Sequence, residues 1–284
     1  MDEDDPGDLH GVDEGTMRSL LIHEARVHAT PGRELRDMGD GLLLFDPNEP
    51  EPFWNRLEGL QWPSDPDAFD RRLAEALVLF TTLSRQPHVW PAPAFDQPAD
   101  LAERLVAHGF RDMGMGCVMV LTDHDRPLRG APRRYGPEVS VERLDSSSGR
   151  PAEETVDTVA AILCGAFDIE EGLQPGVRRE IGASLDNPAF TYYLVRLGGE
   201  PAAVAKRATF DDLSYLSSIG TADWARGRGL GELVTATAAA DAIAAGSEWI
   251  HLGVFADNTA AIRLYRRVGF ELLGRPAPDL LLIG

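Results

Sequence analysis

Along the last part of the chain, the pattern of hydrophobic and polar positions alternates between that of strands and that of helices. Residues 213–219 have the pattern of a strand, and the alanine-rich stretch 230–245, ended by Gly246, has the apolar content of a packed helix. Residues 250–254 then predict a second strand and residues 258–270 a second helix. A glycine-rich loop joins the first strand to the first helix, so the predicted order is strand, loop, helix, strand, helix.

The stretch before this segment predicts a strand, two helices and a hairpin. The strand covers residues 139–144, and the hairpin pairs residues 191–197 with residues 202–208 across Gly198-Gly199-Glu200. Two helices are expected between them, at 153–167 and 177–185. The first helix places four apolar side chains on one face: Val156, Val159, Ala160 and Leu163.

The first half of the chain follows a similar order. Helices are predicted at 14–28, 67–83 and 99–108, and strands at 34–38, 42–45, 56–61, 88–90 and 116–121. Residues 101–110 also align without a gap on residues 261–270, with Gly-Phe matching Gly-Phe. In this alignment Pro98 stands where Asn258 stands, and Leu105 where Tyr265 stands. An internal repeat is therefore predicted.

Composition divides the chain into a tail, two domains and a connection. Residues 1–12 are acidic and predict a disordered tail, and residues 128–137 have the Pro, Gly and basic content of an inter-domain linker. The expected domains are residues 13–127 and 138–284. The helix predicted at 67–83 follows Trp62-Pro63-Ser64-Asp65-Pro66, which contains one acid, Asp65, and no glycine.

Charge and composition exclude several classes of protein. The 284 residues are 43% hydrophobic and carry a formal net charge of −19, which argues against nucleic-acid partners and favours cationic ones. The acidic start does not resemble a signal peptide, and no apolar run reaches the roughly 18 residues of a membrane span. A cytoplasmic protein without membrane partners is expected, as a monomer or a homodimer.

No metal site is predicted. His23 and His28 are five residues apart, which places them on different faces of a helix, whereas the helical zinc motif needs histidines four apart. Cys117 and Cys164 are too few for a cysteine zinc site or a disulfide framework, and apolar neighbours indicate buried thiols.

The glycine-rich loop has the chemistry of a diphosphate site. Gly227, Gly229 and Gly231 remove side chains where a helix begins, so that backbone N–H groups and the positive end of the helix dipole can approach an anion. Arg226 and Arg228 add two cations in an otherwise acidic chain. The alternative is a glycine turn that only starts a helix.

Two motifs together resemble the GNAT superfamily of acyl-CoA-dependent N-acetyltransferases. The loop fits R-x-x-G-x-G/A, and the later L-x-V-x-x-x-N-x-x-A-x-x-L-Y-x-x-x-G-F is matched in register by Leu252, Val254, Asn258, Ala261, Leu264, Tyr265, Gly269 and Phe270. The resemblance covers about the last 95 residues. It implies an α/β (α+β) fold of two GNAT-like domains, each a mixed, mostly antiparallel sheet flanked by helices, with a degenerate first domain that binds no coenzyme.

The resemblance also implies roles for individual residues in acetyl transfer from acetyl-CoA to an amine. The coenzyme would lie along Ser218, Ile219 and Thr221, with the Ile219 N–H polarising the thioester carbonyl. Tyr265 would protonate the leaving thiolate. The expected coenzyme contacts also include Arg226, Gly227, Arg228, Gly229, Leu230, Gly231, Asn258, Ala261 and Tyr265. Packing for Tyr265 and helix capping for Asn258 remain alternatives.

The general base is left open by the sequence. His251 is one candidate because its ordinary pKa lies near 6.5. Acids in the predicted substrate loops are others: Glu170, Glu171, Asp211 and Asp212.

The sequence suggests three functions. The first is an N-acetyltransferase acting by direct attack on a primary amine, expected to belong to a small molecule. The second is a sensor or interaction protein that binds acetyl-CoA without turnover. The third, a dinucleotide-binding dehydrogenase, is disfavoured because a meander precedes the glycine loop, where a βαβ unit would be needed.

Overall fold

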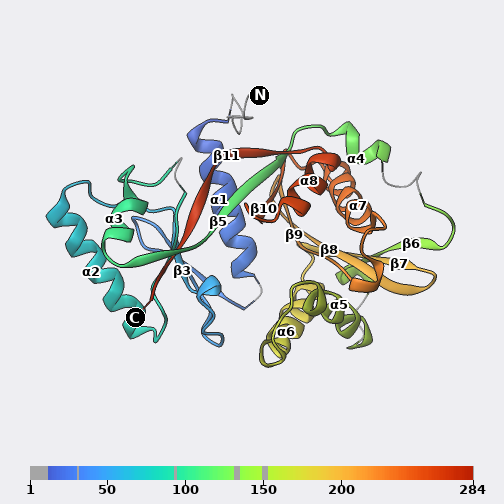
Figure 1. The fold of residues 1–284 in the computed structure, drawn as a ribbon, viewed down its shortest axis with the longest axis horizontal. Coiled ribbons are helices and arrows are strands. Elements are labelled where there is room, and N and C mark those ends of the chain that lie inside the picture. Colours follow the sequence, from blue (N-terminus) through green and yellow to red (C-terminus); the bar gives the residue numbers. More distant parts are fainter. Residues whose placement is uncertain (1–11, 31, 93–94, 131–134, 149–152, 284) are drawn as a thin grey trace. The chain divides into compact units, whose positions relative to one another are not determined.

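The protein divides into two compact units, each built of β-strands with helices packed on them. The computed structural model describes residues 12–30, 32–92, 95–130, 135–148 and 153–283. Unit 1 comprises Met1–Val118, Val254–Asp257 and Leu272–Gly284, and unit 2 comprises Met119–Gly253 and Asn258–Glu271. The predicted tail falls mainly on residues 1–11, which lie outside the described residues. Helices flanking mostly antiparallel strands confirm the predicted α/β fold class (Figure 1).

Unit 1 is built on the strand order β1-β2-β3-β4-β11-β5, in which β11 covers Phe270–Leu282. The pairs β1/β2, β2/β3 and β4/β11 are antiparallel, and β3/β4 is parallel. Its core packs α2 and α3 on these strands through Leu57, Phe69, Phe80 and Leu105. The elements of unit 1 are α1 (Glu14–Ala29), β1 (Glu34–Asp37), β2 (Leu42–Phe45), η1 (Pro52–Trp54), β3 (Arg56–Glu58), α2 (Pro66–Thr82), β4 (His88–Trp90), α3 (Leu101–Ala107) and most of β5 (Phe110–Leu121).

Unit 2 has the strand order β10-β9-β8-β7-β6. Strands β6 to β9 form an antiparallel meander, and β10 pairs in parallel with β9. Its elements are α4 (Asp125–Gly130), β6 (Val139–Leu144), η2 (Ser146–Ser148), α5 (Glu153–Ala166), η3 (Glu171–Leu173), α6 (Gln174–Leu185), β7 (Phe190–Leu197), β8 (Glu200–Phe210), β9 (Leu213–Thr221), η4 (Asp223–Ala225), α7 (Leu230–Ala244), β10 (Trp249–Phe255) and α8 (Thr259–Val268).

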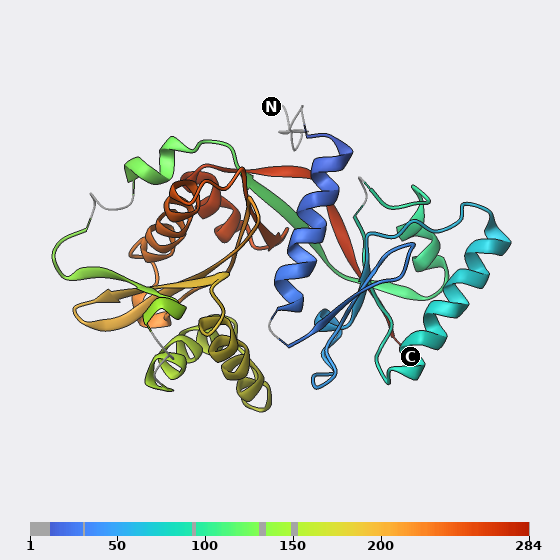
Figure 2. The same ribbon diagram turned by 180° about the vertical axis from the view of Figure 1, so that it is seen from behind.

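Helices cover both faces of the sheet in unit 2. Figures 1 and 2 show α5 and α6 on one face and α7 and α8 on the other. Val159, Leu163 and Ile181 of α5 and α6 pack against Tyr192 and Val204 of the sheet. The predicted apolar face of the helix at 153–167 is therefore the face that meets the strands.

Three of the described strands contribute to both units. The division falls inside β5, between Val118 and Met119, inside β10, between Gly253 and Val254, and inside β11 (Phe270–Leu282), between Glu271 and Leu272. Within unit 1, Leu280 of β11 pairs with Val89 of β4. The two compact units thus differ from the predicted ranges 13–127 and 138–284, because the last strand of the chain is paired with a strand from its first half. The functional division into a degenerate and a coenzyme-binding half stays a prediction.

Some elements were not expected from the pattern. Strand β11 was not predicted, β5 begins at Phe110 rather than near residue 116, and α4 occupies residues 125–130 at the start of the predicted linker. Residues 131–134 of that linker lie outside the described residues. Across the described ranges, no helix combines the length and apolar character needed to cross a membrane.

Candidate active site

The site is organised by the point at which β9 and β10 stop pairing. Their parallel register runs from Trp249↔Leu213 to Leu252↔Leu216, while β9 continues to Thr221. On its other side β9 remains paired with β8 over this stretch. The end of β9 therefore has one open edge, along which β10 no longer pairs with it.

A bulge lies in this open stretch of β9. Ser217 is opposite Lys206 and Gly220 is opposite Val204, so that Ser218 and Ile219 face the single residue Ala205. Ser218 has a φ of 49°, in the left-handed region that side chains with a Cβ rarely adopt. A bulge interrupts the regular hydrogen-bond ladder, and strained backbone of this kind concentrates at functional sites. The backbone N–H groups of Ser218 and Ile219 can therefore be turned toward a ligand.

Helix α7 begins without a side-chain cap. Its N-cap is Gly229, with a φ of 77°, and no side chain accepts a hydrogen bond from the first turn. The first helical hydrogen bond runs from the Leu233 N–H to the Gly229 carbonyl, over 3.0 Å. The N–H groups of Leu230 and Gly231 precede it, in the first turn, where backbone N–H groups cannot pair within a helix.

The glycines of the loop meet different steric requirements. A Cβ on Gly227, whose φ is 75°, would meet nothing within 4 Å, so only the backbone conformation requires glycine there. A Cβ on Gly229 would lie 2.7 Å from the Tyr135 hydroxyl oxygen. A Cβ on Gly231 would lie 3.1 Å from Leu264 of α8 and 3.3 Å from the Thr221 hydroxyl. Gly231 thus lets α7 approach both α8 and the end of β9.

Both arginines of the loop are exposed. Arg226 forms an ion pair with Asp223 at 2.9 Å, and its guanidinium lies 3.5 Å from the Ala166 carbonyl. An exposed pair of this kind contributes little to stability, so Arg226 can be redirected to an anion at low cost.

Asn258 caps α8. Its side-chain oxygen accepts a hydrogen bond from the Ala261 N–H over 3.1 Å, which commits both of these atoms to the helix start. The side-chain nitrogen of Asn258, an exposed residue, keeps its capacity to donate to a ligand. The capping alternative is thus observed, and it is compatible with a coenzyme contact.

Tyr265 lies on the buried face of α8. Its side chain is 8% exposed, and its ring meets Phe270 edge-on at 6.3 Å between centroids. Burial raises the pKa of the Tyr265 hydroxyl to about 12. The hydroxyl therefore keeps its proton throughout the neutral pH range and is available as a donor.

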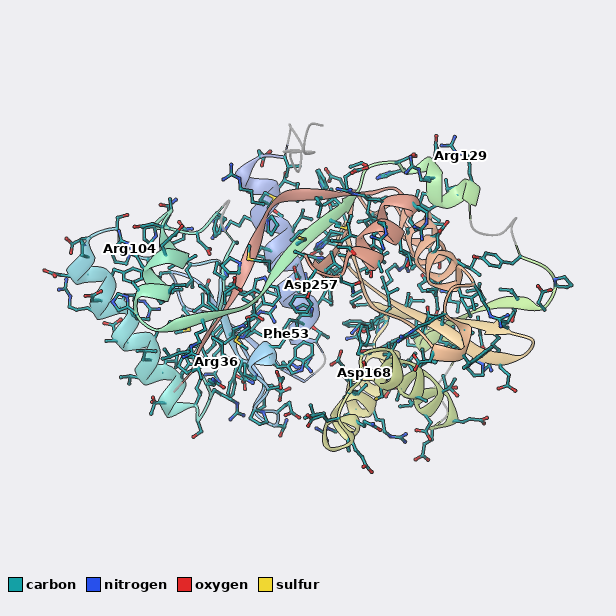
Figure 3. All side chains as sticks on the ribbon, in the orientation of Figure 1. Arg36, Phe53, Arg104, Arg129, Asp168 and Asp257 are labelled. Atoms are coloured by element: carbon teal, nitrogen blue, oxygen red, sulfur yellow. The ribbon has the colours of Figure 1, made fainter. Side chains whose placement is uncertain are left out.

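The candidate bases are differently placed. His251 is fully buried, with its ring 4.9 Å from that of Tyr215 on the neighbouring strand, a position that suits packing better than proton exchange with an acceptor. The four acids named from the sequence, Glu170, Glu171, Asp211 and Asp212, are all exposed. Asp168, which follows α5 and is labelled in Figure 3, is exposed as well.

In unit 1, the corresponding helix start and strand ends are satisfied by side chains of unit 1 itself. Asp65 caps α2, and its side chain accepts a hydrogen bond from the Ala68 N–H over 2.9 Å. Beyond the parallel pair β3/β4, the two carboxylate oxygens of Asp96 accept hydrogen bonds from the Leu60 N–H at 2.8 Å and the Ala92 N–H at 2.6 Å. Burial raises the pKa of Asp96 to about 7, with a further contribution from the charge of Glu58.

Sequence reasoning missed several contacts around the loop. Tyr135, from the predicted linker, donates a hydrogen bond from its hydroxyl to the Gly229 carbonyl over 2.8 Å. Arg267 of α8 forms an ion pair with Glu232 in the first turn of α7 at 2.7 Å. Neither partner was signalled by local sequence, although a tyrosine in a basic, proline-rich connection could have been questioned as a ligand-site residue.

Residues 157–270 match the model of the Acetyltransferase (GNAT) family. No curated protein matches the chain. Within the described ranges, no group of three or more His, Cys, Asp or Glu side chains could hold a metal ion.

Solved structures share the fold over nearly the whole chain. A GCN5-related N-acetyltransferase from Kribbella flavida is 21% identical, with 97% of each chain covered and a TM-score of 0.70. A tandem GNAT protein from the clavulanic acid biosynthesis pathway is 16% identical, with 95% of this chain and 94% of that chain covered and a TM-score of 0.60. A functionally unknown conserved protein from Staphylococcus epidermidis is 13% identical, covers 88% of this chain and 94% of its own, and has a TM-score of 0.65. At identities this low, the structural similarity shows a shared fold alone.

Proposed function

We propose, from the match of residues 157–270 to the model of the GNAT acetyltransferase family, that this protein transfers an acetyl group from acetyl-CoA to a primary amine of a small molecule. The single observation that supports this most strongly is the β9 bulge at Ser218 and Ile219, on the open edge of the strand that leads into the uncapped start of α7. A thioester carbonyl and a diphosphate need these two features at the two ends of one loop.

The start of α7 would hold the diphosphate. The N–H groups of Leu230, Gly231 and Glu232 supply donors and the positive end of the helix dipole, and Arg226 and Arg228 supply cations. Gly227 and Gly229 allow close backbone approach. The Asn258 side-chain nitrogen is a further donor at the start of α8. Ser218 and Thr221 would flank the pantetheine arm along β9.

The chemistry would proceed by direct attack in a ternary complex. The neutral amine nitrogen forms a bond to the thioester carbonyl carbon, the carbonyl oxygen gains negative charge, and the Ile219 N–H stabilises that charge. The carbon–sulfur bond then breaks, the amide is left on the acceptor, and the thiolate receives a proton. The amine proton leaves to water, because the acids named above are solvated and His251 is enclosed.

Tyr265 would supply the hydrogen bond, and then the proton, to the departing thiolate. Thiols of the cysteine type have a pKa of about 8.5, well below the pKa of about 12 of this buried hydroxyl. Full proton transfer is therefore uphill, and the larger share of the effect should come from the hydrogen bond. Its contribution to the rate is then expected near the lower end of the range for positioned proton donors.

The acceptor is expected to be cationic at neutral pH, because the chain carries a formal net charge of −19. A polyamine or an aminoglycoside fits this class. In a cytoplasmic setting, kcat/KM for such an acceptor should fall as salt is added, because screening weakens the attraction.

The experiment that tests the proposal is a panel of amines incubated with the protein and acetyl-CoA, with release of free thiol as the readout. Thiol release that depends on one class of amine would support the transferase. Calorimetric binding of acetyl-CoA with no thiol release from any amine would favour the second candidate, a sensor or interaction protein. This second candidate is retained because burial raises the pKa of the Tyr265 hydroxyl to about 12, which makes the hydroxyl a weak proton donor to the thiolate.

A further inference from the structure

We propose that Tyr135 is a positioning residue for the coenzyme, whose hydroxyl orients the peptide group that presents the Leu230 N–H to the diphosphate. The inference rests on the proposed function, because it takes the start of α7 as the place where coenzyme A binds. It assigns a role to the segment that connects the two halves of the sequence.

The contact joins Tyr135 to the N-cap of α7. The Tyr135 hydroxyl donates to the Gly229 carbonyl over 2.8 Å, and the same carbonyl accepts the first helical hydrogen bond from the Leu233 N–H over 3.0 Å. The hydroxyl also lies against the Gly229 Cα, since a Cβ there would be 2.7 Å away from it. Any side chain at position 229 would displace Tyr135.

Because the peptide bond is planar, a hydrogen bond that orients the Gly229 carbonyl also orients the Leu230 N–H. The Gly229 carbonyl and the Leu230 N–H belong to one trans peptide group, so they point in opposite directions. Holding the carbonyl toward Tyr135 and Leu233 holds the N–H toward the open start of the helix. This N–H is the first donor of the proposed diphosphate site.

Such a restraint matters because of the glycines around it. Gly227 and Gly229 both have positive φ, at 75° and 77°, and glycine moves between positive and negative φ at little cost. A loop of this kind pays conformational entropy when a ligand orders it. A hydroxyl that already holds the peptide reduces this loss and raises affinity by preorganisation.

The segment that carries Tyr135 is also attached to α8. Arg126 of α4 donates from its guanidinium to the Arg266 carbonyl, in the last turn of α8, over 2.9 Å. Arg126 is in turn paired with Asp123 at 3.1 Å. The connection therefore contacts both helices of the proposed coenzyme site, at Arg266 and at Gly229.

The test compares Tyr135→Phe and Tyr135→Ala with the wild-type protein. Calorimetric titration with coenzyme A should give a Kd about five-fold higher in the Phe variant, as expected for the loss of one neutral hydrogen bond. The Ala variant should lose at least as much. Pantetheine, which lacks the diphosphate and the nucleotide, should bind all three proteins equally in an NMR titration.

The matched control is Tyr193→Phe, which removes another hydroxyl of unit 2, hydrogen-bonded to Asp241 over 2.9 Å and remote in sequence from the loop. It should leave the Kd for coenzyme A unchanged. Equal Kd values for wild type and Tyr135→Phe would overturn this inference alone, as would an equal loss of pantetheine binding. A wild-type protein that binds no coenzyme A would overturn the proposed function together with it.

Discussion

Helices α2 and α7 occupy the same place in their units but begin in opposite ways. Each connects two parallel strands, α2 joining β3 to β4 and α7 joining β9 to β10. The α2 start is satisfied by its own Asp65 carboxylate, with Pro66 in the first turn, whereas the α7 start has a glycine cap and no side-chain acceptor. A helix that satisfies its own N-terminal donors gains stability and gives up an anion site.

The strands that flank these helices also differ in whether their backbone N–H groups are already occupied. Beyond β3 and β4, the Asp96 carboxylate bridges the Leu60 and Ala92 N–H groups, whereas beyond Leu216 and Leu252 the pairing of β9 and β10 ends and β9 bulges. A buried carboxylate that occupies two backbone donors leaves none for a ligand. Both differences support the proposal that the first half binds no coenzyme.

The largest expected effect comes from placing the α2 type of cap on α7. Gly229→Asp puts a carboxylate where the diphosphate would bind and drives a Cβ toward the Tyr135 hydroxyl. Charge repulsion and blocked approach should raise the calorimetric Kd for coenzyme A at least about 100-fold. Gly229→Ala, which has the strain without the charge, should lose less. Gly246→Ala is the control for positive φ, since Gly246 has a φ of 84° in open space; wild-type affinity in Gly229→Asp would contradict the comparison.

The Asp96 bridge should make unit 1 sensitive to pH. Because the pKa of Asp96 is raised from 3.8 to about 7, the folded protein binds this proton more tightly than the unfolded chain. Its contribution to stability is therefore complete below about pH 3.8 and is lost as pH rises through about 7. Between pH 4 and 7 the loss should amount to about 3 kcal/mol. Denaturant unfolding of Asp96→Asn should lack this component, and identical pH profiles for the two proteins would refute it.

Tyr265→Phe tests whether the Tyr265 hydroxyl of unit 2 assists departure of the thiolate. The ring and its contact with Phe270 are kept, and only the hydroxyl is lost. We expect kcat to fall about 100-fold where chemistry limits the rate, while the Kd for coenzyme A stays constant. Tyr193→Phe, another buried tyrosine, should retain wild-type kcat. Full turnover in Tyr265→Phe across the pH range would assign Tyr265 to packing alone.

The smallest effect is expected from removing the α2 cap. Asp65→Ala should lower the free energy of unfolding by about 1 kcal/mol, the usual cost of losing an N-cap. It should not create a coenzyme site, because the Asp96 bridge and the glycine-free loop remain. Calorimetry should give one site per chain in both the wild type and the variant, and a second site in either protein would refute the degenerate first half.

Local chemistry made the loop and its helices predictable. Glycine at positions 227, 229 and 231 and the spacing of Asn258 and Tyr265 are patterns that a few neighbouring residues determine. The strand at Leu42–Phe45 and the helix after Asp65 were likewise predicted at their observed positions, because apolar period and capping act over short distances.

Long-range pairing explains what the sequence did not reveal. The bulge at Ser218 depends on which residues of β8 lie opposite, and the role of Asp96 depends on backbone 36 residues earlier. Tyr135 meets a carbonyl 94 residues later, and β11 completes unit 1 beside β4. None of these partners can be read from a local pattern. The same limit applies to His251, whose full burial follows from its strand neighbours.

The pairing of β11 with β4 has a consequence for synthesis of the protein. Most of unit 1 precedes unit 2 in the sequence, yet the strand that pairs with Val89, β11, covers Phe270–Leu282 and follows nearly all of unit 2. A domain made first on the ribosome ordinarily can fold first. Here β4 cannot pair with β11 until β11 has left the ribosome, so unit 1 can be completed only after unit 2 has been translated in full.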